Sequence, residues 1–429
     1  MLSDPSLNTG ILLYIDPGTG SMLFALLIGI ISTFTFLFRK TILALKFRLS
    51  GGKTDASVTS DRIDFVIFSD NKRYWNVFKP ICDEFEKRGI AESVYYWTAS
   101  PDDPALNEHY EHVKCEFIGE GNHAFARLNM MDAGICLSTT PGLDVYQWKR
   151  SKGCRFYAHI MHSLGDGTGY RMFGLDFFDA VMLCSDYARS KLVELEDLRG
   201  LPAKELPIVG CTYMDEMQKR YDHMQHAERP DFRTVLLAPS WGKESILSTF
   251  GERLIDALLH TNFHIIIRPH PQSMSSEKEQ MEKLMNEYPD SDRLEWNFDL
   301  DNYAVLDRSD ILISDYSSVI FDYTLIFNRP ILFMERTIDN SAYDSAWLEE
   351  PMFIPAICPK LGMPIREEDL EDLQPLIENT ITSKIFENNR SEVRDMIWQN
   401  IGNCAEASVD YLIKKHRELT AVSEQSQEE

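Results

Sequence analysis

The chain has 429 residues, of which 44% are hydrophobic and 11% aromatic, so it can form two ordinary globular domains and an additional segment. Its formal net charge is −24, from 43 basic and 67 acidic residues. An acidic surface of this size argues against nucleic acid as the main partner, because the phosphate backbone binds positively charged faces.

An uncharged apolar run lies near the N-terminus. Residues 18–38 (GTGSMLFALLIGIISTFTFLF) match the length that crosses a bilayer, and the alternative interpretation is a buried core helix. Only acidic charges precede the run, whereas Arg39 and Lys40 begin a set of cations behind it. The positive-inside rule therefore predicts a single-pass anchor in the inner (plasma) membrane, with the N-terminus outside and the remainder cytoplasmic. We expect residues 1–50 to form this anchor with a basic juxtamembrane segment, and residues 51–60 to form a linker.

The eight cysteines show no metal-binding or disulfide pattern. None pairs as C-x-x-C, and none lies beside histidines at zinc spacing. Most lie in apolar runs such as GICL and VMLC, where free cysteine packs as a small hydrophobic residue. The sequence therefore predicts reduced thiols in a cytosolic domain, and no metal site.

After residue 61, short apolar runs alternate with helical patterns, which predicts an α/β fold with largely parallel, doubly wound sheets. The expected strands are 63–69, 93–98, 115–119, 134–139, 155–163, 180–185 and 206–211, and then 233–240, 263–271, 293–298, 310–316 and 330–334. The expected divisions are a first Rossmann-like domain over 61–211, a connection over 212–231, a second such domain over 232–385, C-terminal helices packing back over 386–419, and a disordered tail over 420–429.

The serine turn within residues 310–334 (DILISDYSSVIFDYTLIFNRPILFM) reads as a buried strand, a turn, a short helix and a second strand. Helix N-termini that follow strands bind phosphates, because their N–H groups are unpaired and the helix dipole favours an anion. Ser317 and Ser318 add two hydroxyls there, and Asp322 comes round to nearly the same face one turn later. An ordinary N-cap is the alternative interpretation.

Two further motifs end strands of the second domain. In IIIRPHPQ, a fully apolar strand stops at Arg268, and two prolines restrict the backbone around His270, so both cations can contact phosphate oxygens. In LLAPSWG, Ser240 lies at a turn where it can cap a helix or contact a phosphate, and we expect Trp241 to be a packing residue.

The first domain carries AHIMHSLGDGTGYR, in which an apolar strand leads to His162. His162 is a candidate general base, because the usual pKa of histidine lies near working pH. The flexible loop after it, with Ser163, Gly165, Asp166 and Gly167, fits close approach to an acceptor, and the alternative is an ordinary turn. We expect His159, three residues earlier on the strand, to point to the opposite face and to be structural.

LAPSW, RPHP and SDYSSVIFDYTLIFNRPILF, in that order, resemble the CDP-glycerol glycerophosphotransferase family, the teichoic-acid polymerases and primases of bacterial envelopes. The resemblance implies a GT-B fold in which two Rossmann-like domains face a cleft. It implies that His270 and the two serines contact the donor phosphates, Asp322 the ribose, and that His162 is the base. The first domain departs from the family's Trp-His-Gly loop with its nearby lysine, since Met161 and Ser163 flank His162 here.

The resemblance implies a membrane-anchored enzyme that moves glycerol phosphate from CDP-glycerol to an acceptor hydroxyl of a lipid-linked envelope polymer and releases CMP. No cofactor is expected, and the sequence has no Walker A, H-E-x-x-H or G-x-S-x-G motif. One alternative is a GT-B glycosyltransferase or sugar-nucleotide epimerase that uses a UDP- or CMP-sugar. Another is a non-catalytic membrane scaffold with the same fold.

Overall fold

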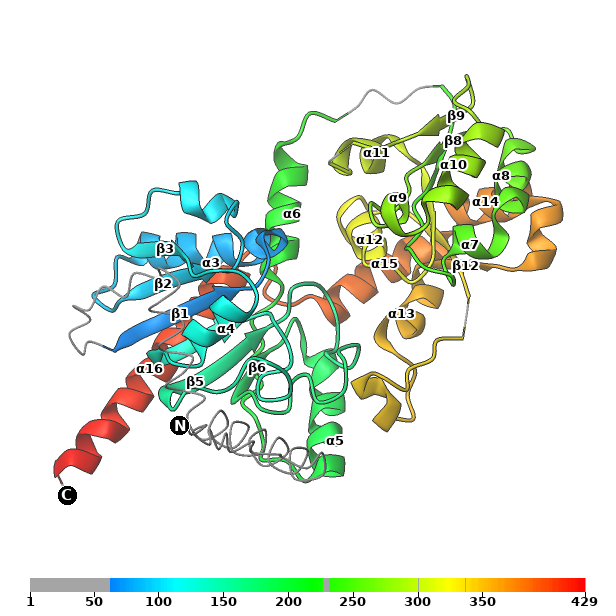
Figure 1. The fold of residues 1–429 in the computed structure, drawn as a ribbon. Helices are drawn as coiled ribbons and strands as arrows, with labels where there is room; N and C mark the ends of the chain where they lie inside the picture. The colour runs from blue at the N-terminus through cyan, green and yellow to red at the C-terminus, as the bar shows by residue number, and fades with distance from the viewer. Residues whose placement is uncertain (1–61, 227–230, 300, 336, 429) are drawn as a thin grey trace, which may run out of the picture. The chain divides into compact units, whose positions relative to one another are not determined.

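The structure, a computed structural model, describes residues 62–226, 231–299, 301–335 and 337–428, and residues 62–429 form one compact unit (Figure 1). The expected anchor at 18–38 and linker at 51–60 lie outside the described residues. Within the described ranges, no helix is both long enough and apolar enough to cross a bilayer.

The first half of this unit contains a six-stranded parallel sheet in the order β3-β2-β1-β4-β5-β6. Its strands are β1 (Ile63–Ser69), β2 (Val94–Thr98), β3 (Val113–Phe117), β4 (Asp132–Ser138), β5 (Gly153–Ile160) and β6 (Ala180–Met182). The central strands are buried on both faces, which is why they read as continuous apolar runs rather than alternating ones.

The second half repeats this topology. Its strands are β7 (Thr234–Leu237), β8 (His264–Ile267), β9 (Leu294–Trp296), β10 (Ile311–Ser314), β11 (Ile331–Met334) and β12 (Gly362–Ile365). All are parallel, and their order β9-β8-β7-β10-β11-β12 is the order of the first sheet strand for strand. Each sheet therefore has one switch point, between β1 and β4 in the first and between β7 and β10 in the second.

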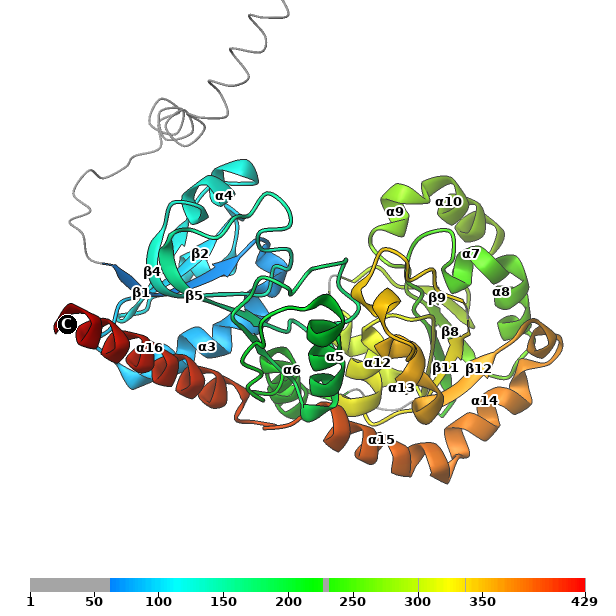
Figure 2. The same ribbon diagram turned by 90° about the horizontal axis from the view of Figure 1, so that it is seen from below.

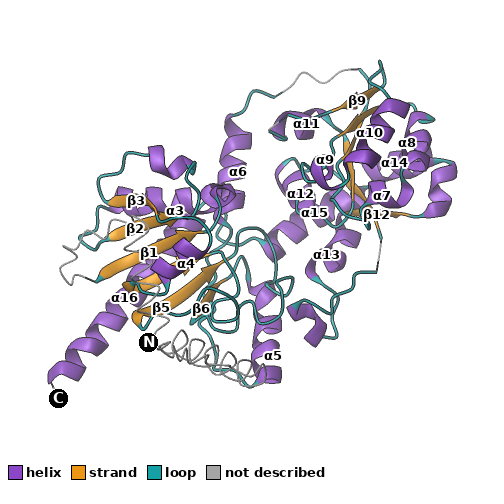
Figure 3. Ribbon diagram, in the orientation of Figure 1, coloured by secondary structure: helices purple, strands orange, loops and turns teal. Residues whose placement is uncertain are grey.

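Helices accompany the strands in both halves (Figure 3). Those that follow strands of the first sheet are α3 (Trp75–Arg88), α4 (Asn122–Leu128), α5 (Arg189–Arg199) and α6 (Thr212–His223). The second half has α7 (Ile246–Phe250), α8 (Glu252–Leu259), α9 (Ser273–Ser276), α10 (Lys278–Glu287), α11 (Tyr303–Arg308), α12 (Val319–Phe321), the π-helix η4 (Asp322–Ile326), α13 (Phe353–Leu361) and α14 (Leu373–Thr382). Short 3-10 turns are η1 (Lys72–Tyr74), η2 (Pro104–Asn107), η3 (Asp186–Ala188), η5 (Asp344–Trp347) and η6 (Glu367–Glu371).

Two elements differ from the sequence expectation. Residues 206–211 are not a strand but pair with the first sheet through isolated bridges, because Pro207 has no N–H to donate to a ladder. The edge strand β12 was missed, since its residues GMPI combine glycine and proline, and a Cβ on Gly362 would meet Ile331 O.

The chain ends in α15 (Lys384–Ile397) and α16 (Cys404–Glu428), and Figure 2 shows α16 running beside α3. Apolar side chains of α16, including Val409 and Leu412, join the core beneath β1. The expected disordered tail over 420–429 instead continues α16 to Glu428, because this stretch holds good helix formers and no proline or glycine.

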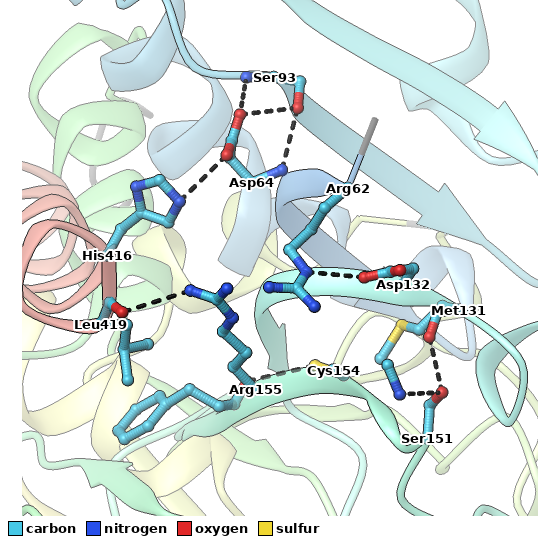
Figure 4. A network of polar contacts seen from close by, with 12 residues as sticks. Arg62, Asp64, Ser93, Met131, Asp132, Ser151, Cys154, Arg155, His416 and Leu419 are labelled. Atoms are coloured by element: carbon cyan, nitrogen blue, oxygen red, sulfur yellow. Dashed lines mark hydrogen bonds and ion pairs between the residues drawn. The ribbon is translucent and has the colours of Figure 1, made fainter. Parts of the chain in front are cut away.

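A polar network fastens α16 to the amino end of the first sheet (Figure 4). Asp64 at the start of β1 accepts hydrogen bonds from Ser93 N at 2.8 Å and Ser93 Oγ at 3.0 Å. The other oxygen of the same carboxylate lies 3.1 Å from His416 Nε2 of α16. Arg155 of β5 donates to Leu419 O at 3.3 Å, so two neighbouring regions of the sheet hold the last helix.

Candidate active site

The polar motifs that the sequence singled out lie at the carboxyl ends of the two sheets. Ser240 follows β7 and Asp315 follows β10, the two strands that flank the switch point of the second sheet. Ligands of doubly wound sheets bind in the crevice at such a point, because the loops from the two strands diverge to opposite faces. The second candidate, His162, follows β5 of the first sheet.

Asp315 organises the switch point of the second sheet. Its side chain is fully buried and accepts hydrogen bonds from Ser240 N at 3.0 Å and from Ile246 N at 2.9 Å. Its carbonyl oxygen accepts Ser317 N at 2.8 Å. The carboxylate of Asp315 thus joins the LAPSW loop to the start of α7, and the backbone carbonyl of the same residue holds the serine turn. Sequence reasoning missed this role, although a polar residue directly after a buried strand was the available signal.

Asp322 differs from the two serines in burial and in its hydrogen-bond partner. Ser317 is partly buried and Ser318 exposed, whereas Asp322 is buried and accepts a hydrogen bond from Tyr213 Oη at 3.1 Å. The π-helix η4 begins at Asp322, directly after the short helix α12 that follows Ser318. Burial raises the pKa of Asp322 to about 7.

His270 is held by its own turn. Its Nδ1 accepts Gln272 N at 3.1 Å, so the neutral imidazole carries its proton on Nε2 and can donate from there. Burial lowers the pKa of His270, although the Asp315 and Glu277 carboxylates oppose this, so the structure favours a neutral donor over the expected cation. The Trp241 ring lies 6.4 Å from the His270 ring and is 52% exposed, which differs from the expected packing role.

Arg268 supports the loop after β9. Its guanidinium donates to Asn297 Oδ1 and, at 2.7 Å, to Asp299 O. These contacts use two of the nitrogen donors of Arg268. The side chain therefore binds the loop after β9, and its two amino groups are not both available to a ligand.

His162 makes two contacts through one ring nitrogen. Its Nδ1 lies 3.3 Å from Thr139 Oγ1 and 3.2 Å from Tyr170 Oη. Burial, and then the charge of Arg73, lowers the pKa of His162 to about 4. His162 is therefore neutral at physiological pH, which is the state that a general base requires.

His159 is not isolated from His162, contrary to the expectation that the two point to opposite faces. Its Nε2 lies 3.1 Å from the same Tyr170 hydroxyl. The alternation of a strand does not reach residue 162, because β5 ends at Ile160 and the chain turns there.

The switch point of the first sheet adds groups that sequence reasoning missed. Asp70 and Arg73 follow β1, and Thr139 follows β4. The Arg73 guanidinium lies over the Tyr74 ring, 4.7 Å from its centroid, and donates to Tyr74 Oη at 2.7 Å. Burial raises the pKa of Asp70. The signal was present in the sequence, since the strand 63–69 is followed at once by the polar run DNKRY.

A lysine holds the loop after His162 through Asp166. Asp166 is buried and accepts Thr168 N at 3.0 Å and Thr168 Oγ1 at 2.7 Å, and its other oxygen lies 3.1 Å from Lys191 Nζ. Lys191 also lies 3.2 Å from Glu350. The loop therefore has a nearby cation that its own sequence lacks, supplied by α5. Asp166 anchors the loop and makes no described contact with His162.

A pocket of about 360 Å³ opens beside His162. The loop residues Ser163, Gly165, Asp166 and Gly167 line one side, and Tyr316, Tyr343 and Phe353 line the other. Among the described residues, no lysine or arginine lines it, so these residues suit an uncharged group rather than a diphosphate. Within the described residues, no group of histidine, cysteine or acidic side chains could hold a metal ion.

Two parallel sheets with one strand order, each with polar groups at its switch point, define a GT-B-like two-domain α/β protein. A structure of wall teichoic acid polymerase TagF, a variant soaked with CDPG, superposes with a TM-score of 0.53 at 16% identity, over 89% of this chain and 98% of that one. A putative UDP-N-acetylglucosamine 2-epimerase from Listeria monocytogenes gives 0.54 at 14% identity, over 83% and 97%. UDP-GlcNAc 2-epimerase from Methanocaldococcus jannaschii gives 0.51 at 13%, over 82% and 100%. At identities of 13–16%, these structural similarities show a shared fold and nothing further.

Residues 214–346 match the sequence model of the family CDP-Glycerol:Poly(glycerophosphate) glycerophosphotransferase. The match contains LAPSW, RPHP and the serine turn, and it confirms the family resemblance that these motifs predicted. No curated protein sequence matches the chain.

Proposed function

We propose that the chain transfers glycerol phosphate from CDP-glycerol to an acceptor hydroxyl and releases CMP. The observation that carries this proposal is the family match over residues 214–346, which spans the loops after β7, β8 and β10. These loops meet at the switch point that Asp315 organises, where a nucleotide diphosphate would bind.

In the proposed reaction the acceptor oxygen attacks the β-phosphorus of CDP-glycerol. A new P–O bond forms, the bond from the β-phosphorus to the bridging oxygen breaks, and CMP leaves with that oxygen. The hydroxyl proton passes to His162 Nε2. The serine turn at Ser317 and Ser318, together with His270 Nε2–H, binds the diphosphate and stabilises charge on the leaving group. Positioning and charge stabilisation of this kind supply most of the catalysis in phosphoryl transfer.

The acceptor side of the proposal is a hydroxyl of a lipid-linked envelope polymer, reached at the inner face of the plasma membrane. The apolar run at 18–38 and the cations behind it support this location. Among the described residues that line the pocket beside His162 there is no lysine or arginine, which supports an acceptor whose reacting end is a neutral polyol or sugar.

The donor assay tests the proposal directly. Purified full-length protein in detergent is incubated with labelled CDP-glycerol, CDP-ribitol or UDP-N-acetylglucosamine and a polymer acceptor, and the released nucleotides are separated by chromatography. We expect CMP from CDP-glycerol and label in the polymer. Release of CMP from CDP-ribitol alone, or turnover of the UDP-sugar without CMP release, would exclude glycerol phosphate transfer.

The epimerase alternative shares the fold of the two UDP-N-acetylglucosamine 2-epimerase structures. Such an enzyme would convert the UDP-sugar without any acceptor, which the same assay detects. The scaffold alternative predicts that His162→Ala and His270→Ala proteins still support the cellular phenotype of the wild-type chain, whereas the transferase proposal predicts that both lose it.

A further inference from the structure

Two polar side chains, Tyr170 and His159, form a chain behind the candidate base His162. Tyr170 Oη lies 3.2 Å from His162 Nδ1 and 3.1 Å from His159 Nε2. His159 is fully buried, its ring packs against Phe178 with centroids 5.1 Å apart, and its Nδ1 has no hydrogen-bond partner among the described residues. A buried histidine whose one described hydrogen bond goes to a tyrosine of the candidate site requires an explanation beyond packing.

We propose that Tyr170 and His159 are positioning residues that fix the orientation of His162 and the ring nitrogen on which it carries its proton. The proposal rests on the transferase function above, in which His162 Nε2 accepts a proton. For Nε2 to offer a lone pair, the neutral ring must hold its proton on Nδ1. Nδ1–H then donates to Tyr170 Oη, and the Tyr170 hydroxyl donates in turn to His159 Nε2.

His159 has the properties that the end of this chain requires. Burial, and then the neighbouring His162, lowers the pKa of His159 to about 3, so its ring is neutral at physiological pH and its Nε2 can accept a hydrogen bond. A cationic His159 would donate a hydrogen bond from Nε2, so the Tyr170 hydroxyl would accept from His159 rather than donate to it. This arrangement has an energetic cost at His159 Nδ1. That buried nitrogen carries a proton for which the described residues offer no acceptor.

The opposite direction of the chain has a different chemical consequence. If His159 Nε2–H donated to Tyr170 and Tyr170 donated to His162 Nδ1, then His162 Nε2 would carry a proton and could not act as a base. Thr139 Oγ1, 3.3 Å from the same Nδ1, is a second partner for His162, so loss of Tyr170 weakens the restraint on the ring without abolishing it.

The kinetic test uses full-length protein with CDP-glycerol and acceptor. Tyr170→Phe is expected to lower kcat about 10- to 100-fold with less than about a twofold change in donor KM, within the range of general-base effects. His159→Phe should lower kcat less than Tyr170→Phe does. His159→Gln should recover part of the loss seen in His159→Phe, because the glutamine side chain can accept the tyrosine proton. The double variant Tyr170→Phe/His159→Phe should be no slower than Tyr170→Phe. Tyr157→Phe, which removes a buried hydroxyl of β5 that accepts Ser151 N at 2.7 Å, is the control and should leave kcat unchanged.

The proposal would be overturned if the kcat losses of the two single variants multiplied in the double variant. It would also be overturned if kcat were unchanged in both single variants. Nitrogen NMR of the histidine rings at neutral pH provides an independent readout, and it is expected to show the His162 proton on Nδ1. A proton on Nε2 would overturn the stated direction of the chain. His162→Ala separates the two levels of argument: if it retains activity, the proposed base is wrong, and if it is inactive while Tyr170→Phe is normal, only the positioning role fails.

Discussion

At the scale of single residues, the charge of Arg73 acts on His162, because it is the one charged group that lowers the pKa of this ring alongside burial. Removing a nearby positive charge favours the protonated ring, so Arg73→Ala should raise the pKa of His162 from about 4 while burial keeps it below 6.5. An NMR titration of His162 measures this shift, and the acidic limb of kcat/KM should move to higher pH with it. Lys72→Ala, which removes the adjacent cation paired with Asp102, is the control. An unchanged or lowered pKa in Arg73→Ala would contradict the assignment.

Asp322 provides a second prediction at this scale, because burial raises its pKa to about 7. The folded carboxyl binds its proton more tightly than the unfolded one, so its contribution to stability is complete below pH 4 and is lost as pH rises to 7. Asp322→Asn keeps an acceptor for Tyr213 Oη without the buried charge. The variant should match wild type near pH 4 and exceed it at pH 8 by up to about 4 kcal/mol in urea denaturation. Donor KM should also stay unchanged in this variant, since the Asp322 side chain faces Tyr213. A large increase in donor KM would instead be evidence for the ribose contact that the family resemblance implies.

At the scale of elements, the loop after β5 is shaped by a glycine with a left-handed backbone. Gly167 has φ +79°, and a Cβ there would lie 3.0 Å from Leu175 and 3.3 Å from Leu192. Gly167→Ala should therefore cost about 1–2 kcal/mol of stability and lower kcat by displacing the loop that carries His162. Gly169→Ala in the same loop is the matched control, because its Cβ would meet nothing within 4 Å. Equal melting temperatures and kcat values for the two variants would show that the loop is not held as described.

The elements also show what a sequence can and cannot predict here. Buried parallel strands such as β8 and β10 are continuous apolar runs ended by polar residues, so both the strands and the polar motifs at their ends were predictable. Gly251, at φ +52°, separates α7 from α8, a local break that periodicity does not reveal. The surroundings of His162 and of the loop after it come from segments after β1 and β4 and from α5. Only the folded topology brings Arg73 and Thr139 to His162, and Lys191 to Asp166.

At the scale of the whole molecule, side chains from both sheets contribute to one core, and buried ion pairs join the two halves. The core cluster includes Val66 of β1 and Leu236 of β7. The segment between β11 and α13 pairs with the acceptor region through the bridge Arg171↔Tyr343. The pocket beside His162 therefore depends on contacts between residues more than 150 positions apart, which explains why neither half by itself contains the complete candidate site.

Arg199 gives the sharpest test of this dependence. Its guanidinium is 4% exposed and lies 2.7 Å from Asp176 in the first half and 2.6 Å from Asp344 in the second. Arg199→Met leaves two buried carboxylates without a counter-charge, so it should lower the free energy of unfolding by about 3–5 kcal/mol. Arg62→Met, which removes the more exposed pair with Asp132, should change it by less than about 1 kcal/mol. Urea denaturation followed by tryptophan fluorescence measures both. If the two variants lose equal stability, the buried ion pairs do not join the halves, and the pocket beside His162 must be held by the shared apolar core alone.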